Sequence, residues 1–73
     1  MQEQLKYDLE HLFAAYGFIL PNNQPMSGAG FSELIKRHYD CSDPRNNYFA
    51  QLASRCEFRF VKHPSGAIKQ VKD

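Results

Sequence analysis

The chain has 73 residues, of which 42% are apolar, 14% aromatic and 23% charged, and its formal net charge is +1. These values exclude a disordered chain and a multidomain protein, because a chain of this size has room for one hydrophobic core. No apolar run approaches the roughly 18 residues of a membrane span, and the first residues lack the basic region of a signal peptide. We therefore expect a single cytoplasmic domain over residues 1–73.

The first predicted element is a helix that ends at Gly17. Apolar residues recur there at the helical period and form one stripe, which consists of Leu5, Leu9, Leu12, Phe13 and Tyr16. Gly17 is expected to supply a left-handed turn, and Pro21 prevents continuation of the helix. The opposite side of the helix carries Tyr7, His11 and Ala14. Tyr7 there indicates either a protein contact or an isolated surface aromatic residue, and the second is the commoner case.

Residues 18–30 are predicted to form a short strand and a loop. The apolar run Phe18–Leu20 is long enough for one edge strand and too short for a helix. Residues 21–30 hold two prolines, two glycines, two asparagines and a serine. This composition is typical of a loop.

Two further helices are expected. The second begins near Phe31 and is about ten residues long by its apolar period, with a core face made of Phe31, Leu34, Ile35, His38 and Tyr39. The third begins at Asp43 and Pro44, because aspartate caps free backbone amides and proline is well suited to the first helical position. It runs to about Arg55. Its core side is predicted to hold Tyr48, Phe49, Leu52, Ala53 and Cys56, and its outward side Asn47, Ala50, Gln51 and Ser54.

The last part of the chain predicts a β-hairpin. From Glu57 the apolar period changes to two, which places Phe58 and Phe60 on one side of a strand and Arg59 and Val61 on the other. Residues 63–66 form a turn and residues 67–72 a returning strand. The order helix, strand, helix, helix, strand, turn, strand is that of a winged helix-turn-helix. The predicted fold class is therefore α+β, with three helices and a C-terminal hairpin as the wing.

Residues 31–68 resemble the OST-HTH, or LOTUS, family of winged helices. The matching positions are Ile35, Lys36, Arg37, Asp43, Pro44, Arg45, Asn46, Phe49, Leu52, Phe58, Phe60 and Gly66. The chain departs from the family pattern at residues 47–48 and 55–56. The resemblance implies RNA binding, or in some members the docking of an RNA helicase.

The predicted nucleic-acid-binding residues lie on the third helix and on the hairpin. They are Arg45, Asn47, Gln51, Arg55, Arg59, Lys62, His63, Lys69 and Lys72. Amide side chains can bond base edges, and cations can neutralise phosphates. An ordinary solvated helix face, and lysines that protect an edge strand from aggregation, explain the same residues nearly as well. Residues 1–30 carry one cation against three carboxylates and residues 31–73 eight cations against five carboxylates, which weakly favours a polyanion on the C-terminal half, and a solvated mixed-charge surface explains the distribution equally well.

Chemistry at a metal or a nucleophile is not expected. Zinc ligands usually come in close pairs, and among His38, Cys41, Cys56 and His63 only the first two approach that spacing. The two cysteines are too few for a disulfide-stabilised secreted scaffold, which favours reduced thiols. No spacing joins a nucleophile to a base and an acid, so we expect no enzyme activity and no cofactor.

Two functions remain open from the sequence. The first is a winged helix that binds nucleic acid, with RNA ahead of DNA because of the family resemblance. The second is a protein-interaction module, such as an adaptor or an inhibitor, that uses the first helix or the groove beside the wing. The near-neutral net charge of +1 motivates the second.

Overall fold

The structure is a computed structural model that describes residues 2–71. The elements are α1 (Gln2–Tyr16), the 3-10 turn η1 (Gly17–Ile19), β1 (Met26–Ser27), α2 (Gly28–His38), α3 (Pro44–Arg55), β2 (Arg59–Lys62) and β3 (Ile68–Val71). The strands form one antiparallel sheet in the order β1-β2-β3. The domain is thus α+β, with three helices and a three-stranded antiparallel sheet, which is compatible with a winged helix.

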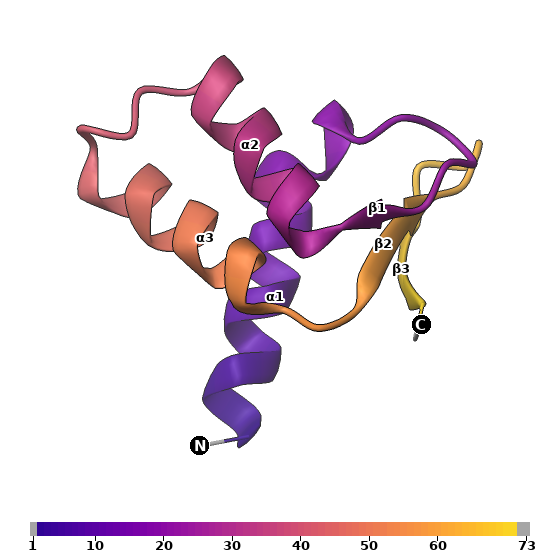
Figure 1. Cartoon of the computed structure of the whole chain (residues 1–73). Helices are drawn as coiled ribbons and strands as arrows, with labels where there is room; N and C mark the ends of the chain where they lie inside the picture. Colours follow the sequence, from indigo (N-terminus) through magenta and orange to yellow (C-terminus); the bar gives the residue numbers. More distant parts are fainter. Residues whose placement is uncertain (1, 72–73) are drawn as a thin grey trace.

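The helices pack as a pair crossed by a third. Figure 1 shows α2 and α3 side by side, with α1 crossing behind them, and the sheet lies to one side of all three. The first turns of α1 extend beyond α2 and α3 in this view. Within residues 2–71, no helix has both the length and the apolar character needed to cross a membrane.

The core lies where the helices meet the inner face of the sheet. Leu12, Phe31, Ile35 and Phe60 are its largest fully buried side chains. The ring of Phe60 makes edge contacts with Phe13 and Phe31, at centroid distances of 5.2 and 5.4 Å. Edge-to-face pairs at this spacing are a favourable aromatic geometry, so Phe60 joins β2 to α1 and α2.

Local signals fixed the ends of α3 and the hairpin as predicted. The Asp43 carboxylate accepts a hydrogen bond of 2.9 Å from the Arg45 amide, and Pro44 is the first residue of α3. In the hairpin, the Gly66 amide donates to the His63 carbonyl at 2.8 Å, and Gly66 has φ of 93°. Only glycine adopts that conformation without strain, so the turn depends on Gly66.

The edge strand predicted at residues 18–20 is wrong. This segment begins in η1, where the Leu20 amide donates to the Gly17 carbonyl at 3.0 Å. The strand instead lies at Met26–Ser27, inside the predicted loop, because these residues pair with Phe60 and Arg59 of β2. A two-residue strand held by a distant partner leaves no local pattern in the sequence.

Gly17 also differs from its prediction, because it is absent from the glycines with positive φ in the described chain. Instead, glycine is needed at position 17 because there is no room for a side chain. A Cβ atom at position 17 would lie 3.0 Å from Cγ1 of Ile68. Gly17 therefore allows β3 to approach the end of α1.

The predicted faces of α2 and α3 need two corrections. His38 is exposed rather than part of the core. In α3, Tyr48 is 47% exposed and Ala50 is fully buried, the reverse of the prediction. The cause is the close approach of α2 to α3, where a Cβ on Gly28 would lie 2.1 Å from the Ala53 carbonyl oxygen. Backbones this close leave room only for small residues between them.

Candidate functional site

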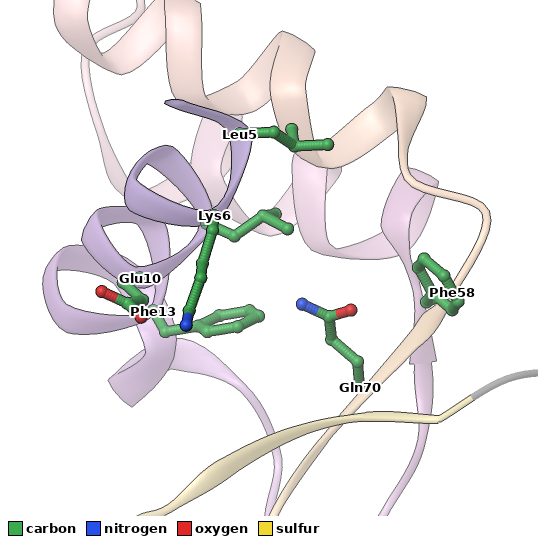
Figure 2. A pocket seen from close by; sticks show the side chains of 7 residues that line it. Leu5, Lys6, Glu10, Phe13, Phe58 and Gln70 are labelled. Carbon is green, nitrogen blue, oxygen red and sulfur yellow. The ribbon is translucent and has the colours of Figure 1, made fainter. Parts of the chain in front are cut away.

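An apolar groove lies between the N-terminal half of α1, the start of β2 and the end of α3. Leu5, Leu9 and Phe58 line both halves of it. One half, of about 410 Å³, is also lined by Phe13 and by Gln70 from β3. Figure 2 shows Gln70 pointing into this half, between the rings of Phe13 and Phe58.

The other half of the groove reaches α3 and has a volume of about 390 Å³. Leu52 and Cys56 line it beside Leu5 and Phe58. The Cys56 thiol donates a hydrogen bond to the Leu52 carbonyl at 3.3 Å. Burial raises the pKa of this thiol, which favours its protonated form.

The groove exists because the leucine stripe of α1 extends beyond the part of the helix that α2, α3 and β2 cover. Leu12 and Tyr16 are buried, whereas Leu9 is half-buried and Leu5 is 49% exposed. Phe58 faces them from the link before β2 and is 39% exposed. An exposed cluster of large apolar side chains is a candidate binding surface.

The rim of the groove carries balanced charge. Lys6 and Glu10 project from α1, and Arg55 and Glu57 from the end of α3 and the link after it. Two cations and two carboxylates give no net attraction for a polyanion. The groove is thus suited to an apolar side chain of a ligand. The neighbouring polar groups of that ligand can pair with either the cations or the carboxylates of the rim.

The polar row predicted on α3 is present. Asn47, Gln51 and Arg55 are all exposed and are spaced four residues apart, which places them on one side of the helix. Arg45 is exposed at the start of α3, with its Nε 3.9 Å from the Asp43 carboxylate. Sequence reasoning therefore located a solvent-facing row, of which Arg55 also borders the groove.

The predicted cations of the hairpin are divided between the two faces of the sheet. Val61 pairs with Lys69 and Arg59 with Val71, so Arg59 and Lys69 share the outer face. Lys62 lies on the inner face, and its Nζ donates to the Phe18 carbonyl at 3.0 Å. Lys72 lies outside the described residues.

The predicted binding residues do not form one continuous surface. His63 is half-buried and begins the hairpin turn, which Figure 1 shows on the opposite side of the molecule from the start of α3. The segments that carry Arg45 and His63 are therefore not neighbours. The structure brings together the row on α3 and, separately, the outer sheet pair of Arg59 and Lys69.

A group of aromatic side chains lies where α1 meets α3. Tyr7 contacts His11 at a centroid distance of 5.0 Å, and His11 stacks on Phe49 at 6.2 Å. Beside them the Tyr48 hydroxyl donates to the Asp8 carboxylate, and this bond raises the pKa of Tyr48. The side of α1 opposite its leucine stripe thus partly faces α3, a contact that the helical period alone does not reveal.

Sequence reasoning named a groove beside the wing as one possible protein-binding surface but did not identify its lining residues, because Leu5, Leu9 and Phe58 belong to the same apolar patterns as buried residues. The only hint is length, since α1 has 15 residues against 11 and 12 for the helices that cover it. Among residues 2–71, no three histidine, cysteine or acidic side chains gather closely enough to hold a metal ion. Comparison of the chain with models of known families, with curated proteins and with solved structures found no match.

Proposed function

We propose that this protein is a small protein-binding module whose groove between α1, β2 and α3 holds an apolar segment of a partner. The observation that carries the proposal is the convergence of Leu5, Leu9 and Phe58 from two distant parts of the chain on one exposed hollow. Burial of apolar area is the main favourable term in protein association. A few large apolar contacts in a pocket commonly supply most of the binding energy.

The electrostatics of the domain support the same choice. The rim of the groove is balanced, and the net charge of the chain is +1. Proteins that bind nucleic acid usually gather cations on one face. The division of Lys62 and Lys69 between two faces of the sheet is a weaker arrangement for that purpose.

The winged-helix fold is part of this proposal. The order α1, β1, α2, α3, β2, β3 and the antiparallel sheet support it. In this fold the β2-β3 hairpin is the wing, and the groove lies beside the wing, where it meets α1.

Selection from a random-peptide library tests the proposed function. We expect the wild-type protein to enrich peptides that share a large apolar residue. Leu5→Asp should abolish their binding, because a carboxylate in the groove loses its hydration without gaining a partner. The matched control is Phe18→Asp, since Phe18 is 67% exposed and does not line the groove. Enriched peptides that bind Leu5→Asp as well as wild type would refute the groove as the binding site.

Nucleic-acid binding is the second candidate, favoured by the exposed row of Asn47, Gln51 and Arg55 and by the OST-HTH resemblance. Electrophoretic shifts with single- and double-stranded RNA and DNA at two salt concentrations test it. Salt-dependent binding that Arg55→Gln weakens would support this candidate. No shift with any of these probes at either salt concentration would contradict this candidate.

A further inference from the structure

We propose that the partner segment binds as an added β-strand along β3, with apolar side chains facing the groove and acidic side chains facing the outer sheet surface. This inference rests on the proposed protein-binding function and specifies how the partner is held. Strand addition to an exposed sheet edge is a common mode of peptide recognition, in which main-chain bonds give affinity and alternate side chains give specificity.

The free edge of β3 follows from the hydrogen-bond register. β3 is the last strand in the order β1-β2-β3. The His63 amide donates to the Ala67 carbonyl at 2.9 Å, which makes these residues a hydrogen-bonded pair. Hydrogen-bonded pairs alternate along an antiparallel ladder, so the next ones are Val61 with Lys69 and Arg59 with Val71.

The backbone groups of the intervening residues must therefore point away from β2. On β3 these residues are Ile68 and Gln70, whose amides and carbonyls face the open edge. The same alternation on β2 is directly visible, because the Lys62 carbonyl points toward the other neighbour and accepts from Asn23 at 2.6 Å. Ile68 and Gln70 thus offer two donors and two acceptors to an incoming strand.

The groove begins where that strand would lie. Gln70 projects from β3 into the groove half lined by Lys6, Leu9 and Phe13 (Figure 2). A residue directly opposite Gln70 on an added strand has its side chain on the same side of the sheet. An apolar side chain at that position enters the groove beside Phe13.

Charge selects the residues on the other side of the added strand. The outer face of the three strands carries two cations, Arg59 and Lys69, and no carboxylate. Lys69 is exposed on β3 itself and lies on the outer face. Outward-facing residues of the partner flank Lys69, so glutamate or aspartate there is complementary. The partner is therefore an extended segment in which apolar and acidic residues alternate.

A second copy of this chain is a poorer occupant of the edge. Antiparallel pairing of two β3 strands that uses the edge groups of Ile68 and Gln70 from both copies places Lys69 opposite Lys69. Like charges directly opposite each other destabilise a strand pair. The acidic partner removes this repulsion and replaces it with attraction.

An NMR titration of the isotope-labelled protein tests the inference. The probe is an end-capped hexapeptide of alternating valine and glutamate, and the control peptide alternates valine and lysine. We expect the glutamate peptide to bind with a Kd on the order of 1 mM and to shift the amide signals of residues 68–71. The lysine peptide should bind at least about tenfold more weakly, because its cations meet Lys69.

Two variants separate the edge from the groove. Gln70→Pro removes an amide that faces the open edge and leaves the β2-β3 ladder intact, and we expect about a tenfold loss of affinity or more. Gln70→Ala is its control, because it removes the same groove-lining side chain and keeps the amide, and should lose less affinity. Lys69→Glu keeps the backbone unchanged and should reverse the preference between the two peptides. Unchanged β2 amide signals in both variants confirm that the sheet is retained.

The outcomes distinguish the inference from the function on which it rests. Peptide shifts confined to the groove residues near Leu52, unaffected by Gln70→Pro, would overturn strand addition and leave the binding function standing. Saturation with neither peptide, together with no enrichment from the library, would overturn both. If the amide signals of residues 68–71 shift with protein concentration in the absence of peptide, the edge of β3 binds a second copy of the chain. If Lys69→Glu prefers the same peptide as wild type, the proposal that the partner is acidic is refuted.

Discussion

The two halves of α1 carry the same apolar stripe, but the stripe is buried in the C-terminal half and exposed in the N-terminal half. In the C-terminal half, Leu12 is 0% exposed and Tyr16 is 5% exposed. In the N-terminal half, Leu5 is 49% exposed although it belongs to the same stripe. The difference arises from the elements that pack on α1. α2, α3 and β2 enclose its C-terminal half, whereas its N-terminal half remains exposed as one wall of the groove. An amphipathic helix therefore identifies a face that needs a partner, and tertiary structure decides whether that partner is internal.

The polar contacts follow the same division. In the covered half, the Tyr16 hydroxyl donates to Asn46 of α3, and the Tyr16 ring meets Tyr39 at a centroid distance of 4.8 Å. In the other half, Asp8 receives its bond from the exposed Tyr48. Hydrogen bonds contribute more where water is excluded, so the first contact should stabilise the fold and the second should not.

The largest effect is expected from Gly28→Ala, which disrupts the packing of α2 on α3, the two helices that cover the C-terminal half of α1. The new Cβ would lie 2.1 Å from the Ala53 carbonyl oxygen and 2.9 Å from that of Cys56, so α2 and α3 must separate. We expect a loss of more than about 3 kcal/mol in the free energy of unfolding, measured by urea denaturation. Gly30→Ala is the matched control, because its Cβ would meet only the flexible side chains of Met26 and Ser27. Equal losses in the two variants would contradict the close contact.

The comparison is tested directly by truncating one leucine in each half. Leu12→Ala leaves a cavity in the core and should lower the free energy of unfolding by about 3 kcal/mol. Leu5→Ala removes a side chain that is already half in water, so the loss should stay below about 1 kcal/mol. The same denaturation experiment measures both. If Leu5→Ala matches Leu12→Ala, the groove is part of the core rather than a binding surface.

Tyr16→Phe sharpens the comparison within the covered half. Removing the hydroxyl breaks the bond to Asn46, and we expect a loss of about 1 kcal/mol at neutral pH. Burial raises the pKa of Tyr16, so the folded state retains this proton after the unfolded chain has released it. Stability from this group is present below the ordinary tyrosine pKa and is lost as the pH rises above about 10.

The pH dependence provides a separate measurement for Tyr16. Denaturation curves recorded on both sides of the tyrosine pKa should show a decrease in stability with pH that is smaller in Tyr16→Phe. An equal decrease in both proteins would assign the effect to other groups.

The smallest effect is expected from Tyr48→Phe, in the uncovered half. Its bond to Asp8 is exposed to water, which replaces the lost partner. We expect no measurable change in the denaturation midpoint. A loss equal to that of Tyr16→Phe would show that the N-terminal half of α1 is held as firmly as the rest.

Much of the fold was predictable because its signals are local. The Asp43–Pro44 start of α3 and the glycine turn at Gly66 depend on backbone groups a few residues away, and both are confirmed. The strand at Met26–Ser27 was missed because it is defined by pairing with β2, more than thirty residues along the chain. The buried face of α3 was misjudged at Tyr48 and Ala50, because side-chain size suggested the opposite of what close helix packing requires.

The candidate site was predictable only in part. The exposed row of Asn47, Gln51 and Arg55 followed from the helical period, since its polar residues could face only water. The residues that line the groove did not, because Leu5 and Phe58 have the same apolar character as true core residues. No property of a single residue distinguishes an apolar side chain that is covered by its own chain from one that is left for a partner.

The sequence by itself determined three helices, a C-terminal hairpin and most of their ends, because capping residues, glycine turns and apolar periods act over a few neighbouring residues. Only the tertiary structure decided that β1 completes the sheet, that the cations of the hairpin lie on two faces, and that α1 extends past its cover. These features depend on contacts between segments far apart in the chain, where the packing of whole elements, rather than local preference, sets which side chains meet water.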